Sequence, residues 1–403
     1  MNVVSDLRSR VLHALALALA LASAGACHAT PYIPADGRQV VERLPGRANP
    51  VQRELLQLRA ELGKNPNDVA RAVALAQRYI EQARQGGDPR YLGYAQAALA
   101  PWWKLAAPGD AVLVLRATLR QSTHQFGPAL ADLDTVLARD SGNVQARLTR
   151  ATVEMVTGDY AAAKASCMRL YSRAPTLVVQ TCLSNIGSVN GDARASFDKL
   201  KAALDQHPDT APAVRTWVQT LLAEMAARLG DTGAADALFK QAMTGLDPDS
   251  YLLGAYADFL LDHGRAAEVA KLLRDQTRND ALLLRYAIAL KAVRSNDAAV
   301  QAAVQVETLR SRFDAAMLRR DTVHQREQAR FELALRGDAS TAVRLAMLNW
   351  AVQKEPADLR ILVETAAASG DAGAARTALD WIAKTRIEDR TIAAAVARLK
   401  AKG

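Results

Sequence analysis

The chain has 403 residues, of which half are apolar, 5% are aromatic and 23% are charged, with a formal net charge of +9. So few aromatic side chains beside abundant alanine and leucine favour closely packed helices and argue against a protein built from sheet layers. Basic and acidic residues are interspersed, without a Lys/Arg cluster or an aromatic-basic alternation, so we expect no nucleic-acid partner. The composition predicts an all-α protein.

Residues 1–29 have the pattern of a secretory signal peptide. Arg8 and Arg10 precede the apolar run VLHALALALALA, and the small-residue stretch SAGACHA follows it. The run is too short to span a bilayer comfortably, so we expect cleavage after Ala29 and a periplasmic or secreted protein. We expect no transmembrane segment in the mature chain.

Two alternatives to a cleaved signal peptide stay open. The segment could remain as an N-terminal membrane anchor. Residues 24–27, with the letters AGAC, also resemble a bacterial lipobox, although Ala24 stands where leucine is usual. This second alternative would place a lipid anchor on Cys27.

The residues after the signal peptide predict a linker and the first helices. Residues 30–50 contain several prolines and glycines without an apolar period, which predicts an extended linker. Residues 51–62 predict a short amphipathic helix, and Asp68 is expected to cap the next one. The pair Trp102-Trp103 is expected to close the first helical unit by packing on its neighbour.

Residues 144–175 predict a helical hairpin. The first helix carries apolar residues on one face, a glycine-aspartate turn follows, and a second apolar face ends at a proline. The residues in these positions are Leu148, Ala151 and Met155, then Gly158 and Asp159, then Ala163, Cys167 and Leu170, and finally Pro175.

This hairpin plan recurs along the chain at a nearly constant spacing. Ala117 and Phe126 precede Ala151 and Tyr160 by one repeat length, about 34 residues. Later copies carry the turn pairs Gly191-Asp192, Gly230-Asp231, Gly264-Arg265, Gly337-Asp338 and Gly370-Asp371. A period of about 34 residues that several residue types share indicates a stacked helical-repeat array. The spacing is looser near its middle, where we expect a helix over residues 299–313 and a charged connection over residues 314–321.

These residues resemble the tetratricopeptide repeat, in which a small residue, a turn glycine, an alanine, a bulky residue and a proline fall at the same spacing. The resemblance implies an all-α, right-handed superhelical solenoid of antiparallel helix pairs that binds partners. We expect about nine pairs over residues 51–385 and a C-terminal capping helix over residues 386–403, because the last unit of a solenoid must cover an apolar face.

In the tetratricopeptide family, the first helix of each unit lines a concave groove. Transferred to matching positions of this chain, the resemblance implies side chains that face the groove and could hold a protein or peptide partner. They are Gln121, Asn185, Trp217, Glu224, Tyr251, Asp258 and Arg360. Trp217 and Tyr251 are the best two, because exposed aromatic side chains are frequent binding hot spots. Each of the seven could equally be an ordinary solvated or packing residue.

Two cysteines remain after signal cleavage, Cys167 and Cys182, eight residues before and seven residues after Pro175. If Pro175 lies in the turn between two antiparallel helices, the thiols sit at the same height on facing helices. An oxidising compartment would then allow a disulfide. The alternative is two buried free thiols that serve as packing residues.

Catalytic and metal-binding motifs are scarce in this sequence. His324 with Glu327 is a single pair at ligand spacing, which falls short of the three protein ligands that zinc needs. The S-x-x-K pattern at Ser196 lacks the companion motifs of the acyl enzymes, and Ser196 occupies a packing position of the repeat. We expect no enzymatic activity, no cofactor and no bound metal.

The leading hypothesis is an exported, non-catalytic scaffold or adaptor that binds a protein or peptide partner in its concave groove, within the bacterial cell envelope. The alternative is a polymer-handling module, in which the positive charge guides an anionic polysaccharide or cell-wall strand during export or assembly. A basic stripe along one face of the protein would favour the alternative.

Overall fold

The computed structural model describes residue 36 and residues 49–106, 108–245 and 247–402. The predicted signal peptide, with Cys27 and Ala29, lies outside these residues, as does almost all of the predicted linker. The chain divides into two units, residues 1–54 and 55–403, and the helix pairs described below belong to the second unit.

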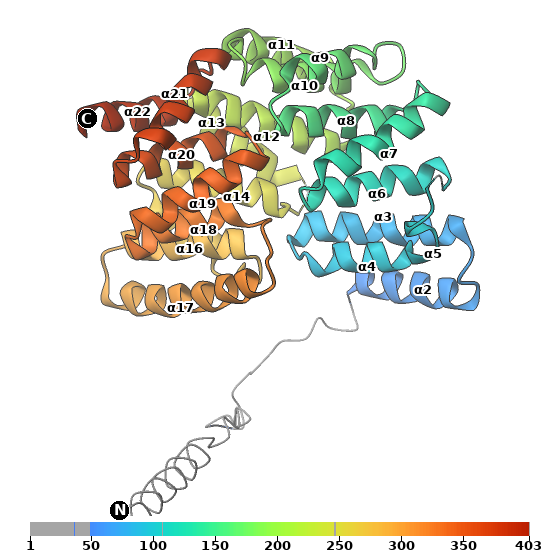
Figure 1. Cartoon of the computed structure of the whole chain (residues 1–403), viewed down its shortest axis with the longest axis horizontal. Coiled ribbons are helices and arrows are strands. Elements are labelled where there is room, and N and C mark those ends of the chain that lie inside the picture. Colours follow the sequence, from blue (N-terminus) through green and yellow to red (C-terminus); the bar gives the residue numbers. More distant parts are fainter. Residues whose placement is uncertain (1–35, 37–48, 107, 246, 403) are drawn as a thin grey trace, which may run out of the picture. The chain divides into compact units, whose positions relative to one another are not determined.

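The described residues form helices and no strand, and most of the helices pack in sequential antiparallel pairs (Figure 1). The pairs are α3 (Val69–Gly86) with α4 (Arg90–Ala98), α6 (Asp110–Ser122) with α7 (Phe126–Arg139), α8 (Val144–Val156) with α9 (Tyr160–Met168), α10 (Thr176–Gly187) with α11 (Ala193–Asp205), α12 (Pro212–Leu229) with α13 (Thr232–Gly245), α14 (Ser250–Asp262) with α15 (Ala266–Leu273), α16 (Asp280–Ala292) with α17 (Asn296–Leu318), α18 (Gln325–Phe331) with α19 (Ala339–Val352), and α20 (Pro356–Ser369) with α21 (Ala372–Thr385). The remaining elements are α2 (Pro50–Lys64), α5 (Ala100–Trp103), the π-helical turn η1 (Glu332–Arg336) and α22 (Arg390–Lys402).

Glycines with a positive φ end the first helices of several pairs. Gly158, Gly191, Gly230 and Gly264 have φ between 72° and 84°, a region that residues with a Cβ rarely adopt. Asp159 then caps α9, because its carboxylate accepts a backbone N–H of the first turn at 3.0 Å. The glycine-aspartate pair therefore ends one helix and begins the next.

Two segments differ from the sequence prediction. Residues 314–318, expected in a charged connection, continue helix α17, which runs to Leu318. Their side chains support this continuation, since Arg310 donates to Asp314 one helical turn away. At the other end, residues 386–389 are not helical, and the last helix begins at Arg390.

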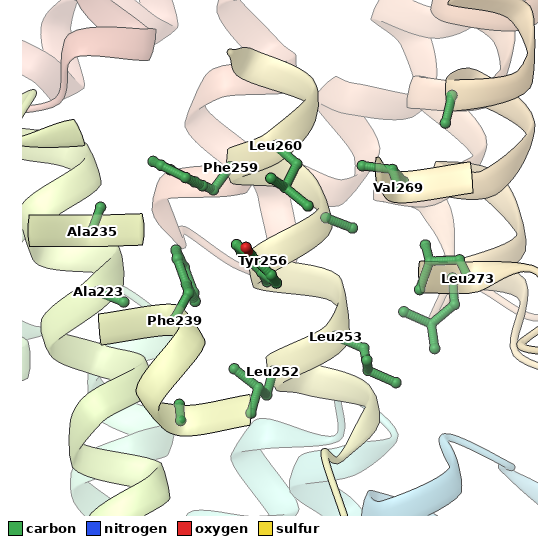
Figure 2. Packing of buried hydrophobic residues seen from close by; sticks show 14 of the residues in the cluster. Ala223, Ala235, Phe239, Leu252, Leu253, Tyr256, Phe259, Leu260, Val269 and Leu273 are labelled. Atoms are coloured by element: carbon green, nitrogen blue, oxygen red, sulfur yellow. The ribbon is translucent and has the colours of Figure 1, made fainter. Parts of the chain in front are cut away.

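The core of the array is built from small residues where helices approach closely and from large rings where they diverge. Figure 2 shows Phe239 of α13 between Ala223 of α12 and the rings of α14. The Phe239 ring lies 5.2 Å from the Tyr256 ring and 5.5 Å from the Phe259 ring, measured between centroids. Ala223 and Ala235 are fully buried at the same seam. Alanine is used here because it lets two helix backbones meet.

Ser196 belongs to such a seam as well. Its side chain is buried on α11, and a Cβ added at Gly187 of α10 would lie 2.4 Å from the Ser196 hydroxyl oxygen. The serine therefore packs where two helices touch, as expected from its position in the repeat.

Repeats far apart in the sequence also contact one another. The backbone N–H of Lys354 donates to the carbonyl oxygen of Val156 at 2.7 Å, and the rings of Tyr160 and Trp381 lie 6.0 Å apart. Near the other end, the Ser250 hydroxyl donates to the carbonyl oxygen of Arg84 at 2.9 Å. The first helices of early repeats thus end against the beginnings of later ones, and their concave side is partly enclosed.

Within the part of the chain that the structure describes, none of the helices combines the length and the apolar character that crossing a membrane requires.

Candidate functional site

Three adjoining cavities lie on the enclosed side, and Arg326 and Glu327 of α18 belong to the walls of all three. Their volumes are about 340, 230 and 60 Å³. We call the largest the central cavity. Its walls come mainly from the first helices of the pairs, α8 to α18, and from the residues that begin α20. Its volume is at the lower end for small-ligand pockets.

The walls of the central cavity carry as many acidic as basic side chains. The acidic residues are Glu224, Asp258, Glu327 and Glu355, and the basic residues are Arg228, Arg285, Arg326 and Lys354. A balanced wall of this kind does not select for a polyanion. Which of these charges are already paired decides what the cavity can bind.

Asp258 on α14 is fully paired. Arg285 of α16 donates to one of its oxygens at 2.5 Å, and Arg330 of α18 donates to the other at 2.6 Å. Burial alone would raise the pKa of Asp258, but the two guanidinium groups outweigh burial and hold this pKa below its ordinary value. Asp258 therefore ties three first helices together and has little capacity left for a ligand.

Arg326 joins α18 to the start of α20. Its guanidinium group lies 3.2 Å from Glu327, 2.9 Å from Glu355 and 3.3 Å from Asp358. Asp358 has no exposed surface, and it accepts the backbone N–H of Glu355 at 2.8 Å. Arg326 and its three carboxylate partners therefore form one network, which fixes this wall of the cavity.

Glu224 and Arg228 lie one turn apart on α12 and do not pair with each other. Both oxygens of Glu224 accept from a single donor, the Tyr251 hydroxyl, at 3.0 and 2.9 Å. Arg228 donates to the Ser188 hydroxyl at 2.9 Å, and its buried Nε has no hydrogen-bond partner among the described residues. A buried donor without an acceptor costs about 1–3 kcal/mol.

Burial shifts the pKa values of two side chains in the cavity wall, Glu224 and Tyr160. Burial raises the pKa of Glu224, whereas the Arg228 charge and the Tyr251 hydroxyl act in the opposite direction. Burial also raises the pKa of Tyr160 to about 12, with the Glu355 charge adding to the effect. These groups therefore titrate in the same partly buried wall.

Lys354 is a third wall charge without an opposite partner. Its Nζ donates to the carbonyl oxygen of Trp350 at 2.8 Å and lies 5.3 Å from the centre of the Trp350 ring. Among the residues that the structure covers, no carboxylate pairs with this ammonium group. Burial lowers its pKa. The cavity thus combines one unpaired carboxylate with two unpaired cations.

Comparison with known proteins supplies no family. No family model matches the chain, and no curated protein matches it. Solved structures with some similarity include a tetratricopeptide repeat protein from Parabacteroides merdae, at 15% identity over 63% of this chain and 91% of that chain, with a TM-score of 0.38. A monomeric mutant of IFIT1 with Gppp-AAAA has 13% identity over 86% of both chains and a TM-score of 0.42. The APC/C hetero-tetramer Cut9-Hcn1 has 12% identity over 87% of this chain and 80% of that chain, with a TM-score of 0.40.

At these TM-scores the similarities carry no argument of their own. The helix pairs of the chain itself are decisive, because the same turn recurs from one repeat to the next over four successive pairs. A glycine with a positive φ ends the first helix of four successive pairs, at Gly158, Gly191, Gly230 and Gly264. The fold is tetratricopeptide-like.

The tetratricopeptide-like array places six of the seven predicted groove residues in the walls of the three cavities. Glu224, Tyr251, Asp258 and Asn185 line the central cavity, and Gln121 and Arg360 line its neighbours. Trp217 lies on α12 with 41% of its surface exposed and belongs to none of these walls. The binding roles of all seven stay predictions.

Arg360 has a structural task within the array. It donates to both oxygens of Asp262 at 2.7 and 2.6 Å and to Glu364 at 2.9 Å, which ties α20 to α14. A bidentate pair of this kind fixes orientation as well as distance.

Several wall residues were missed by the sequence analysis, above all Arg228 and Lys354. Arg228 could have been found, since it follows the predicted Glu224 by four residues on the same helix face. Lys354 could not, because it precedes α20 and reaches the cavity only through the contact of its backbone with Val156.

The disulfide predicted between Cys167 and Cys182 is confirmed. It joins α9 to α10 with the two Cα atoms 5.8 Å apart, and Cys167 is fully buried at the seam between these repeats. The alternative of two free packing thiols is therefore not what the structure shows.

The structure gathers no metal-ligating cluster in the residues it describes, where no three His, Cys, Asp or Glu side chains group suitably. His124 and His324 lie in the wall of one smaller cavity, and burial lowers the pKa of His124.

Proposed function

We propose that this protein is an exported, non-catalytic binding protein of the bacterial cell envelope, and that its central cavity holds a short peptide or a short extended segment of a protein partner. The observation that carries the proposal is the cavity itself, which the first helices surround in part and which is lined by charges that the fold leaves partly unpaired.

The size of the cavity restricts the partner. Contacts such as those of Lys354 with Val156 and of Ser250 with Arg84 close the concave side. A volume of about 340 Å³ has room for a few residues and none for a helix or a folded domain. We therefore narrow the expected partner from a protein laid in an open groove to a short extended segment.

The wall charges support a peptide better than an anionic polymer. Four acidic residues stand among four basic ones, so a polyanion would meet repulsion as well as attraction. The export of the protein rests on the sequence pattern of residues 1–29. Its test is the N-terminus of the protein recovered from the periplasm of an expressing bacterium, which should follow Ala29.

The binding function is tested by equilibrium dialysis of the mature chain against a tryptic digest of a denatured reference protein, with mass spectrometry of the retained peptides. We expect the wild-type protein to retain a subset of short peptides. Asn185→Trp, which fills the cavity from α10, should lose them, whereas Trp217→Ala, outside its wall, should keep them. Retention by neither wild type nor control, or equal retention by a folded Asn185→Trp variant, contradicts the proposal.

A further inference from the structure

The most informative feature of the central cavity is a pair of opposite charges that the fold does not pair. Glu224 and Arg228 occupy one face of α12, one turn apart, and both line the cavity. At this spacing a glutamate and an arginine usually pair across the helix surface. Here each takes a neutral partner from another repeat instead, Tyr251 of α14 for Glu224 and Ser188, just after α10, for Arg228.

Both groups keep unused bonding capacity. A carboxylate accepts about four hydrogen bonds, and Glu224 receives only the one hydroxyl of Tyr251. A guanidinium group has five N–H donors, and Arg228 uses one of its nitrogens, on Ser188. The Nε of Arg228 is buried from solvent and has no partner among the described residues. The cavity thus presents an acceptor group and a donor group of opposite charge.

We propose that the central cavity binds a zwitterionic peptide of two or three residues, with its ammonium group on Glu224 and its terminal carboxylate on Arg228. This inference rests on the proposed function and specifies its ligand. The carboxylate meets a guanidinium group that uses only one of its nitrogens within the fold, and charge-assisted hydrogen bonds of this kind are strong. The ammonium group meets the acceptor face of Glu224 and can donate to both of its oxygens.

The dimensions agree with a ligand of this length. Four residues of α-helix rise by about 6 Å, and an extended peptide spans at most about 3.3–3.6 Å per residue. A dipeptide thus matches the helical rise, and the reach of two long side chains leaves room for a tripeptide. Lys354, the other unpaired cation of the wall, can take an acidic side chain of the peptide.

The rest of the wall does not compete for the ligand's charges. Asp258 is held by Arg285 and Arg330, and Glu355 is held by Arg326. Each of these pairs is fixed by contacts between helices. A ligand carboxylate would therefore find its unpaired donors at Arg228 and Lys354, on the side of the cavity formed by α10, α12 and the start of α20.

The test measures binding of trialanine by isothermal titration calorimetry, beside its N-acetylated and its C-amidated forms. Each block removes one charge-assisted contact, so each should weaken binding about tenfold or more. In Glu224→Gln the free and the acetylated peptide should bind alike, and in Arg228→Gln the free and the amidated peptide should bind alike. The matched controls are Asp205→Asn and Lys201→Gln, the exposed pair on α11, which should behave as wild type.

The outcomes separate this inference from the proposed function. If blocked and free peptides bind the wild-type protein equally, or if only longer peptides bind, the pairing of ligand ends with Glu224 and Arg228 is wrong while the peptide-binding function stands. If no peptide of any length binds, both fail. The comparison of blocked and free peptides uses the wild-type protein, so it does not depend on the folding of a variant.

Discussion

The backbone N–H of Lys354 donates to the carbonyl oxygen of Val156 at 2.7 Å, and this bond joins the end of α8 to the start of α20. Beside it, the ring of Trp381 packs on Tyr160, and α22 packs against α12. Together these contacts make the concave side of the early repeats into the wall of a cavity. The proposed function depends on these contacts, because they bring the unpaired charges of α12 and Lys354 into the walls of one cavity.

Because Trp381 takes part in the contacts between distant repeats, its removal should lower the free energy of unfolding far more than the removal of Trp217. The Trp381 ring lies 5.4 Å from the Trp350 ring and 6.0 Å from the Tyr160 ring. Because Trp381 is only half-buried, Trp381→Ala should lower the free energy of unfolding by about 2–3 kcal/mol. Trp217→Ala removes an equal side chain from an exposed site and should cost less than about 0.5 kcal/mol. Urea unfolding measures both, and equal effects would contradict the closure.

The disulfide predicts a redox-dependent stability. Cys167 and Cys182 are 15 residues apart, and the chain-entropy model gives about 3 kcal/mol for closing a loop of that length. Reduction of the wild-type protein should therefore lower its midpoint of unfolding. The double variant Cys167→Ala/Cys182→Ser should start at the lower value and not respond to reductant. A wild-type midpoint that does not move in reductant would argue against a stabilising bridge.

The buried ion pair of Arg116 and Asp132 predicts that removing the Asp132 charge lowers the free energy of unfolding strongly. Asp132 receives two hydrogen bonds from Arg116, at 2.9 and 2.7 Å, and another from Arg120 at 2.6 Å. Arg116 is 4% exposed, so Asp132→Asn leaves a buried cation without its anion and should cost about 3–5 kcal/mol.

The control for this change is Asp205→Asn in the exposed pair of Lys201 and Asp205 on α11. Its expected cost is below about 1 kcal/mol, because solvent screens an exposed pair. Denaturant unfolding of the two variants under one set of conditions gives the comparison. Similar losses at the two sites would show that the pair of Arg116 and Asp132 is not a buried one in solution.

Two carboxylates of the same cavity predict opposite responses to pH. The pKa of Asp258 is lowered in the folded protein, so its contribution to stability is present above its ordinary pKa of about 3.9 and is lost as pH falls. The pKa of Glu224 is raised, so its contribution is present below about pH 4.3 and is lost as pH rises through the folded pKa.

Asp258→Asn should therefore destabilise the protein at neutral pH and have a smaller effect in acid. Glu224→Gln should be neutral or stabilising at neutral pH, because it removes a partly buried charge and keeps an acceptor for Tyr251. Its difference from wild type should shrink as pH falls below about 4. Midpoints of urea unfolding at several pH values measure both effects. If both variants were destabilised to a similar extent at neutral pH, the opposite pKa shifts assigned to Asp258 and Glu224 would be wrong.

The sequence was sufficient for the helix pairs and for the disulfide, because both depend on local spacing. Turn glycines such as Gly158 and caps such as Asp159 act within a few residues of themselves. The bridge from Cys167 to Cys182 spans one inter-helix turn. Residues 314–318 were misjudged because their charges suggested a connection, whereas bonds one turn apart, such as Arg310 to Asp314, support a helix.

The closure of the concave side could not be read from the repeat pattern. A period of about 34 residues fixes how one pair packs on the next. It does not say how the small rotation per repeat accumulates until α8 meets α20. The contact of Val156 with Lys354 depends on the total rotation accumulated over the repeats between α8 and α20. The sequence therefore predicted which helix face lines the cavities for six of its seven candidate residues, and it missed Lys354 on the facing wall.

The most direct test of the account is hydrogen exchange of the mature chain with and without a saturating peptide retained in the dialysis experiment. We predict that protection rises in the cavity walls, at the C-terminal half of α12, the N-terminal half of α14 and residues 354–358, and that α13, α15 and α17 do not change. Protection confined to those second helices, or unchanged exchange throughout while the peptide is bound, would contradict a binding site inside the array.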